Sequence, residues 1–130
     1  MTLVLDSHGV TSIAVNKRLL AGLRAHGQWP PYVPTVVLTE CLTGDHRRDH
    51  LVNSLLKTCQ LREVGEALAR SAASLRRHRT GKAGVISAVD AIVVSLADQF
   101  GDAVILTSDP AHLRTLVSAN ELSIRVEPVP

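Results

Sequence analysis

The chain has 130 residues, of which 45% are hydrophobic and 20% charged, and its net charge is +2. This composition excludes an intrinsically disordered chain, and the length predicts one domain over residues 1–130 with a single hydrophobic core. No apolar run approaches the roughly 20 residues that span a bilayer, so no membrane segment is expected. The N-terminus lacks the basic segment of a signal peptide, and the two cysteines form no disulfide framework. We therefore expect a reduced, cytoplasmic protein.

The first half of the chain alternates short apolar runs with helical patterns. The predicted elements are a buried strand at 2–5, a helix at 11–25, an extended connection at 29–34, a helix from 35 to 42 or 43, a helix at 46–57, a strand at 59–64 and a helix at 65–78. Thr35 is predicted to cap the helix that follows the connection, with Gly44 just past its end. Gly27 is the predicted stop of the first helix.

The second half begins with the clearest loop, residues 80–84, which carries two glycines. Ser87 is predicted to cap a helix over 88–100 that is apolar on nearly every side and therefore central. A strand at 103–107, a helix at 110–119 and a strand at 123–127 follow. This alternation predicts an α/β fold with a mostly parallel sheet of four to five strands, covered by helices on both faces. Ligands bind such sheets outside the carboxyl ends of the strands.

Three aspartates occupy positions that have two interpretations. Asp6 follows the first strand and Asp109 follows the penultimate one, while Asp90 lies in the first turn of the apolar helix. Each of them could simply cap a helix, because Asp6 precedes a helical pattern, Asp109 precedes Pro110, and Asp90 stands three residues after Ser87. Two of them also lie where a parallel sheet binds its ligands.

Glu40 is harder to explain by capping, because it lies inside a helical pattern one turn after Val36 and Val37. We therefore predict that it lies on an apolar, inward face, where an unpaired charge costs several kcal/mol. Taken together, Asp6, Glu40, Asp90 and Asp109 predict a shared site for Mg²⁺ or Mn²⁺, since hard divalent cations take oxygen ligands. Ser7, Thr107 and Ser108 could orient these carboxylates as a second layer of hydrogen bonds, or could be ordinary turn residues.

A basic cluster comes shortly before Asp90. It consists of Arg76, Arg77, Arg79 and Lys82. Cations beside acids suit an enzyme that acts on a polyanion, so these four side chains are candidate contacts to the phosphates of such a substrate. The alternative, that they form a solvated helix end, has comparable weight, because cations also favour helix C-termini.

The order of these motifs resembles the PIN-domain ribonucleases, and most closely the VapC toxins of type II toxin–antitoxin modules. The motifs are Val-Leu-Asp6-Ser7, Thr-Glu40-Cys, Val-Asp90-Ala and Thr107-Ser-Asp109. The resemblance implies a three-layer α/β/α sandwich, a Mg²⁺- or Mn²⁺-dependent endoribonuclease that acts as a toxin, a cognate VapB-like antitoxin and a homodimer. It implies that Asp6, Glu40, Asp90 and Asp109 are the metal-binding and catalytic residues.

The sequence departs from the family pattern at His8 and at His112, where other residues are more usual. These histidines could contact RNA or could be plain surface residues. An inert PIN-like module that only binds RNA or a partner is a second hypothesis. A receiver-type phosphoacceptor switch is a third, but Asp6 is not followed by an acid and no lysine follows a late strand. A dehalogenase-type phosphatase would need an acid at His8.

Overall fold

The computed structural model describes residues 1–77 and 86–130. Within these two segments, five strands form one parallel sheet with the spatial order β3-β2-β1-β4-β5. The strands are β1 Thr2–Leu5, β2 Tyr32–Pro34, β3 Gln60–Arg62, β4 Ala103–Thr107 and β5 Arg125–Pro128. The predicted parallel sheet is confirmed, with β1 at its centre.

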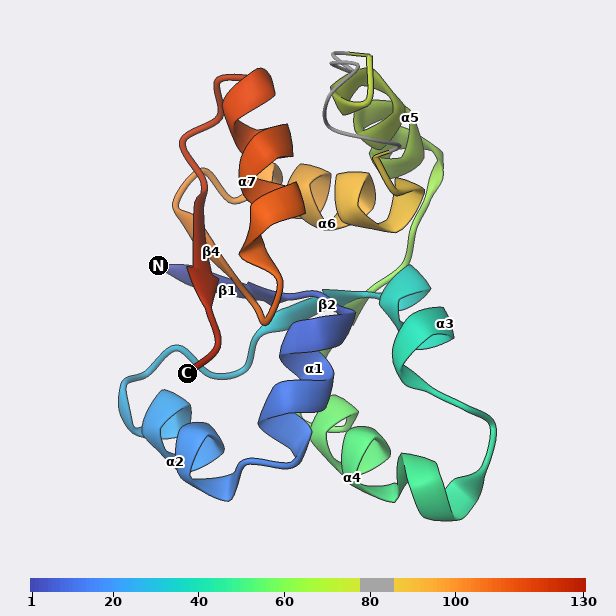
Figure 1. Ribbon diagram of the computed structural model, residues 1–130, viewed down its shortest axis with the longest axis vertical. Helices are drawn as coiled ribbons and strands as arrows, with labels where there is room; N and C mark the ends of the chain where they lie inside the picture. Colours follow the sequence, from blue (N-terminus) through green and yellow to red (C-terminus); the bar gives the residue numbers. More distant parts are fainter. Residues whose placement is uncertain (78–85) are drawn as a thin grey trace.

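Helices cover both faces of the sheet. In chain order they are α1 Ser7–Ala14, α2 Lys17–Ala25, the 3-10 helix η1 Thr35–Val37, α3 Leu38–Cys41, α4 His46–Leu56, α5 Glu66–Leu75, α6 Ala88–Gln99 and α7 Pro110–Ala119. Figure 1 shows α5, α6 and α7 on one side of the strands and α1, α2 and α4 on the other. The fold is therefore the predicted three-layer α/β/α sandwich. No helix in the described part of the chain has both the length and the apolar character needed to cross a membrane.

Two helices clamp the central strands from opposite faces. Helix α6 contacts β1, β2 and β4, and the residues it buries include Ala91, Val93 and Leu96. Helix α1 contacts β1 and β4 with Val10 and Ile13 buried. Because both faces of β1 and β4 are covered, their carboxyl ends are held rigidly side by side. The prediction that the apolar helix is central is confirmed.

Two helix predictions in the first half of the chain are wrong in detail. The predicted helix at 11–25 is two helices, because α1 ends at Ala14 and Asn16 caps α2 by accepting a hydrogen bond from Leu19 N–H at 3.0 Å. The segment after Pro34 is η1 followed by the single turn of α3, and Thr35 makes no capping hydrogen bond. Gly44 does adopt the positive φ of +88° expected past a helix end.

The predicted extended connection at 29–34 contains a strand. Residues 32–34 form β2, although the segment around them is rich in proline, which lacks the N–H that a sheet ladder needs. Pairing survives because β2 aligns with β1 only at Tyr32 and with β3 over three residues. The remaining strand and helix ends differ from prediction by a few residues, as in β3 Gln60–Arg62, α5 Glu66–Leu75 and β5 Arg125–Pro128.

Candidate active site

The carboxyl ends of β1 and β4 place Asp6 beside Thr107. The parallel register aligns Leu5 with Leu106, so the next residue of each strand faces its neighbour. The Thr107 hydroxyl donates to Asp6 Oδ2 at 2.6 Å, and Gly9 N–H donates to Asp6 Oδ1 at 2.7 Å. Asp6 is only 3% exposed. Burial raises the pKa of the Asp6 carboxyl above its ordinary value, although both hydrogen bonds act in the opposite direction.

Gly9 allows α1 to approach the end of β4 this closely. A Cβ atom at Gly9 would lie 2.3 Å from the carbonyl oxygen of Leu106 and 3.3 Å from Asp6 Oδ1. The first distance is far inside van der Waals contact with a backbone atom that cannot move alone. The absence of a side chain at Gly9 is therefore a condition for the position of Asp6, which the sequence analysis did not foresee.

Helix capping explains only part of the acidic pattern. Asp6 does occupy the N-cap of α1 and bonds Gly9 N–H. Asp109 occupies the N-cap of α7, but its side chain makes no capping hydrogen bond. Ser87 alone accepts the capping bonds of α6, from the N–H groups of Val89 and Asp90 at 3.1 and 3.4 Å. The carboxylates of Asp90 and Asp109 are thus free of the capping role that each could have had.

Asp90 shares an electrostatic environment with two of the other acids. Burial is the largest cause that raises the pKa of Asp90, and the negative charges of Asp6 and Glu40 raise it further. The nearby imidazoles of His8 and His112 act in the opposite direction. The structure therefore places Asp6, which follows β1, near Glu40 of α3 and Asp90 of α6.

Glu40 belongs to this group but not in the predicted way. Its side chain is exposed, whereas the sequence predicted an inward, apolar face. The prediction is wrong because α3 is a single turn, too short for the helical periodicity to set which side is buried. The Ser7 hydroxyl donates to Glu40 Oε1 at 3.1 Å, which links α1 to α3.

Asp109 joins the site through Thr107. The Thr107 hydroxyl that donates to Asp6 also accepts a hydrogen bond from Asp109 N–H at 3.1 Å. The Asp109 carboxylate lies 3.5 Å from Nδ1 of His112, one turn along α7. Ser108 is exposed, and no side-chain hydrogen bond of Ser108 is found among the described residues. A single buried hydroxyl thus links the Asp6 carboxylate to the backbone of Asp109, while the Asp109 carboxylate is exposed.

The comparison with known proteins identifies the family. A family model described as "PIN domain" matches residues 8–116. The chain belongs to the PIN domain family. The matched range contains Glu40, Asp90 and Asp109 and begins two residues after Asp6. No curated protein matches the chain by sequence.

Two solved structures share the fold of this PIN domain. One is a DNA-bound VapBC from Salmonella typhimurium, with 14% identity over 98% of each chain and a TM-score of 0.71. The other is VapBC2 from Rickettsia felis bound to a DNA fragment from its promoter, with 14% identity over 100% of each chain and a TM-score of 0.72. At such identities the likeness extends to the fold alone.

The donor chemistry of the site fits a hard divalent cation, but the side chains do not form a closed shell. Among the residues that the structure describes, no three Asp, Glu, His or Cys side chains lie close enough together to hold a metal ion. The charges that raise the pKa of Asp90 act over longer distances than metal coordination. The four acids of this PIN domain therefore offer oxygen ligands and negative charge, and side-chain movement would be needed to enclose an ion.

The basic cluster is divided by the structure. The Arg76 guanidinium donates from Nε to the carbonyl oxygen of Ile86 at 3.1 Å and is half-buried, so it ties the end of α5 to the start of α6. Arg77 is exposed. Arg79 and Lys82 lie outside the described residues.

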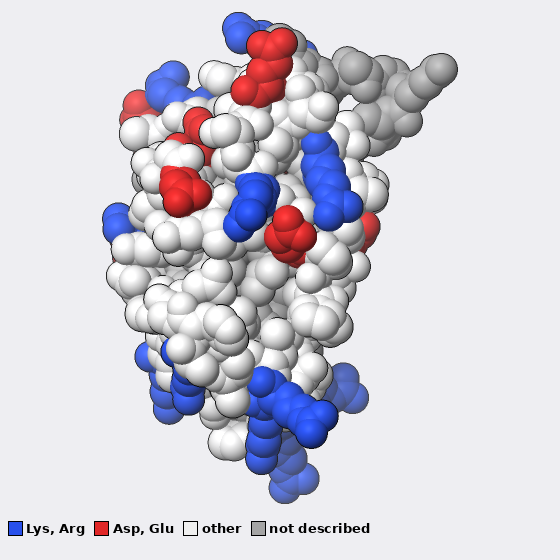
Figure 2. All heavy atoms as spheres, turned by 90° about the vertical axis from the view of Figure 1, so that its left-hand side faces the viewer, with Lys and Arg blue, Asp and Glu red and all other residues white. Residues whose placement is uncertain are grey.

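A different basic region lies at the end of the molecule where Figure 1 places α2 and α4. On the face shown in Figure 2, Lys and Arg side chains gather there without Asp or Glu.

A small cavity opens beside the acids. It has a volume of about 250 Å³ and is lined by Ser7, His8, Thr11 and Glu40. Three of these residues come from α1 and one from α3. Thr11 was not a sequence candidate, because an exposed threonine on a helix carries no signal until the fold places it beside Glu40.

Asp49 is a buried carboxylate that the sequence analysis missed. It is 5% exposed, and its two oxygens accept hydrogen bonds at 2.8–3.0 Å from the Thr43 N–H, the Thr43 hydroxyl and the Gly44 N–H. Burial raises the pKa of Asp49, but the hydrogen bonds outweigh it and leave the pKa below its ordinary value. The carboxylate therefore fixes the turn that follows Glu40 by three residues.

The variant Asp49→Asn is expected to be less stable than the wild type at neutral pH. All three partners are donors, so an amide NH₂ would place a donor against a donor. The wild-type advantage is present above the ordinary aspartate pKa of 3.8 and is lost as the pH falls through the lower pKa of folded Asp49. Urea unfolding at neutral pH and below that value measures the difference. Asp45→Asn is the control, because Asn caps α4 as well as Asp does. Two results would contradict this role of Asp49. One is an equal loss of unfolding free energy in both variants. The other is a stability difference between the wild type and Asp49→Asn that persists in acid.

Proposed function

We propose that this PIN domain is a metal-dependent endoribonuclease that acts as the toxin of a toxin–antitoxin pair. The observation that carries the proposal is that Asp6, Glu40 and Asp90 lie near enough to one another, at the carboxyl end of the sheet, for the charges of Asp6 and Glu40 to disfavour ionisation of Asp90. Such a group is stabilised by a bound cation, and a cation in an acidic site suits phosphodiester hydrolysis.

Membership of the PIN domain family supports nuclease activity. The two similar structures are both VapBC assemblies, which supports a VapB-like antitoxin as the partner of this chain. We propose that the antitoxin covers the acids and offers them a Lys or Arg in place of metal, because clustered carboxylates favour any positive group placed among them. A homodimer is proposed on the same family grounds.

Each acid has a proposed role. Asp6, Asp90, Asp109 and Glu40 would hold Mg²⁺ or Mn²⁺, which when bound polarises a phosphoryl oxygen and activates a water. Thr107 fixes the Asp6 carboxylate and the Asp109 backbone with one hydroxyl. Ser7 orients Glu40. These two hydroxyls would orient the carboxylates of Asp6 and Glu40, while the side chains of Asp90 and Asp109 would adjust around a cation.

Of the four basic residues that the sequence predicts as phosphate contacts, we retain Arg77 as the first candidate among those the structure describes. Arg77 is exposed and is free to meet a phosphate. Arg76 is already bonded to the Ile86 carbonyl group, so its first role is to hold α6 and hence Asp90. Contacts from Arg79 and Lys82 remain a proposal from the sequence.

Cleavage of RNA is expected to require both the metal and Asp6. Purified protein should cut a mixed-sequence RNA in Mn²⁺ or Mg²⁺, lose activity in EDTA and regain it when metal is returned. Asp6→Asn should lower the rate by roughly a hundredfold or more, because it removes a charge from the centre of the site. Gel analysis of end-labelled RNA, with a DNA of the same sequence alongside, measures the rates.

Asp102→Asn is the matched control, since this exposed aspartate precedes β4 at the opposite end of the sheet. Metal-dependent catalysis at these acids would be refuted if the wild type in EDTA, or the Asp6→Asn variant in metal, cleaved RNA as fast as the wild type does in metal. Equal cleavage of the DNA would refute the assignment of RNA as the substrate.

A further inference from the structure

The cavity beside the acids has the size of a site for one base. Its volume of about 250 Å³ lies below the roughly 300–1,000 Å³ of sites for drug-sized ligands. The cavity lies between α1 and α3 and is open to solvent. Among its lining residues, Glu40 is one of the four acids and Ser7 donates a hydrogen bond to it. A strand of RNA with its phosphate at the acids would therefore have a neighbouring nucleotide at this cavity.

The hydrogen-bonding groups of the cavity are mostly acceptors. The Ser7 hydroxyl uses its proton on Glu40 Oε1, and the Thr11 hydroxyl uses its proton on the carbonyl oxygens of Ser7 or His8 at 3.0 and 3.2 Å. Both hydroxyl oxygens keep lone pairs, and the Glu40 carboxylate only accepts. The ligand that fits these groups brings N–H or O–H donors, and a phosphate is disfavoured by the charge of Glu40.

Among the RNA bases, guanine supplies the best match. Its Watson–Crick edge carries two adjacent donors, the N1–H and the N2 amino group, which can meet two neighbouring acceptors at once. The donors of adenine and cytosine stand alone beside an acceptor nitrogen, and uracil has a single N–H between two carbonyl groups. RNA-binding proteins read splayed bases on this edge and stack them on aromatic or imidazole rings, a role open to His8.

We propose that the cavity of Ser7, His8, Thr11 and Glu40 binds an unpaired guanine that flanks the cleaved phosphodiester. The inference rests on the proposed ribonuclease function and adds a base preference to it. Thr11 contributes an acceptor oxygen and takes no part in holding the metal. Loss of that oxygen should therefore weaken the preference for guanine and leave the metal site intact.

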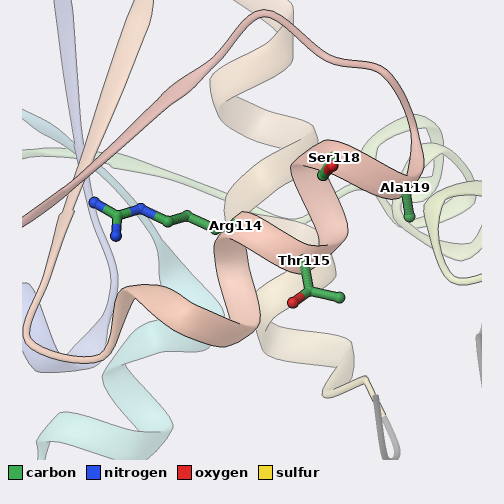
Figure 3. A pocket seen from close by; sticks show the side chains of 4 residues that line it. All are labelled: Arg114, Thr115, Ser118 and Ala119. Atoms are coloured by element: carbon green, nitrogen blue, oxygen red, sulfur yellow. The ribbon is translucent and has the colours of Figure 1, made fainter. Parts of the chain in front are cut away.

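A second cavity provides the matched control. Arg114, Thr115, Ser118 and Ala119 line it, with a volume of about 430 Å³, and Figure 3 shows these side chains along α7. The Thr115 hydroxyl donates to the Ala111 carbonyl oxygen at 3.0 Å, as the Thr11 hydroxyl does to Ser7. Both threonines are exposed on helices. Thr11→Val and Thr115→Val therefore make the same chemical change in two different cavities.

The test measures RNA binding in EDTA, where cleavage does not interfere. The probes are fluorescent uridine heptamers that carry one guanosine, one inosine or no replacement. The wild type should bind the guanosine heptamer roughly tenfold more tightly than the all-uridine one, with inosine between them because it lacks the N2 amino group. Thr11→Val should remove most of this preference, and Thr115→Val none of it. His8→Ala should lower the affinity for all three probes by a similar factor, because stacking tolerates any base.

Other outcomes overturn the proposal. No preference for guanosine in the wild type, or an undiminished preference in folded Thr11→Val, would exclude a guanine site at this cavity. A Thr11→Val variant that loses the Mn²⁺-induced rise in melting temperature would show that the cavity serves the metal instead. Guanosine preference without any cleavage in Mn²⁺ would keep the base site and reject the proposed ribonuclease, so the two failures are distinguishable.

Discussion

Gly9→Ala is expected to destabilise the protein by about 1–3 kcal/mol, as overpacking of a well-packed contact does. The added Cβ would lie 2.3 Å from the Leu106 carbonyl oxygen, so α1 must move away from the end of β4. Alanine usually favours a helix over glycine by about 1 kcal/mol, but this gain cannot compensate for a backbone collision. Because Gly9 N–H also bonds Asp6, the same movement should weaken Mn²⁺ binding. Thermal melts with EDTA and with Mn²⁺ measure both effects.

Gly22→Ala is the matched control for this substitution. Gly22 lies inside α2, and a Cβ there would meet no atom within 4 Å. The replacement should therefore stabilise the protein by about 0.4–1 kcal/mol through a smaller entropy of the unfolded chain. If Gly9→Ala melts as high as Gly22→Ala, the close approach between α1 and β4 does not hold Asp6 in place.

The layered fold could be predicted because its strongest signals are local and repeated. The helix at α6 is apolar around its circumference, and β1 and β4 are short runs of Val, Leu and Ile, so both had to be buried. Gly27 also marked the end of α2 correctly, and its φ of +71° is the left-handed conformation that favours glycine past a helix. These features depend on neighbours in sequence, which a pattern can show.

The errors arise where tertiary contacts override local pattern. The prolines around β2 argue against a strand, yet three of its residues pair with β3 and Tyr32 aligns with Val4 of β1. Asn16 interrupts a continuous helical periodicity with a cap, and periodicity alone cannot place such a break. The helical pattern predicts an inward face for Glu40, but α3 is only one turn long, so its periodicity does not determine which side is buried.

The position of Asp6 and Asp109 at one edge of the sheet could be predicted, but the residues that support them could not. Asp6 and Asp109 follow strands, so the topology alone directs them to one edge. The roles of Gly9, Asp49 and Thr11 depend on contacts that appear only in the fold. Gly9 packs against the Leu106 carbonyl, Asp49 bonds the turn at Thr43, and Thr11 lines a cavity with Glu40. A glycine that lacks a positive φ and an aspartate on a charged helix give no separate signal in the sequence.

Asp90→Asn is expected to have opposite effects on the metal-free and the metal-bound protein. The negative charges of Asp6 and Glu40, together with burial, make an ionised Asp90 unfavourable in the fold. Because the folded pKa lies above the ordinary value, this penalty is present at neutral pH and disappears in acid. A neutral amide should therefore leave the protein in EDTA as stable as the wild type, or more stable.

With Mn²⁺ bound, the wild type should be more stable than Asp90→Asn. A cation that binds only the folded state stabilises it by RT ln(1 + [L]/Kd), about 2.7 kcal/mol at a hundredfold excess over Kd, and raises the melting temperature by several degrees. Asp90→Asn should lose most of this gain, whereas Asp98→Asn, an exposed position on the same helix, should keep all of it. A helix-capping role predicts a loss of up to about 1 kcal/mol with or without metal. Melts of the three proteins, each in EDTA and in Mn²⁺, separate these outcomes, and a wild-type melting temperature that does not respond to Mn²⁺ would reject a metal site built from the four acids.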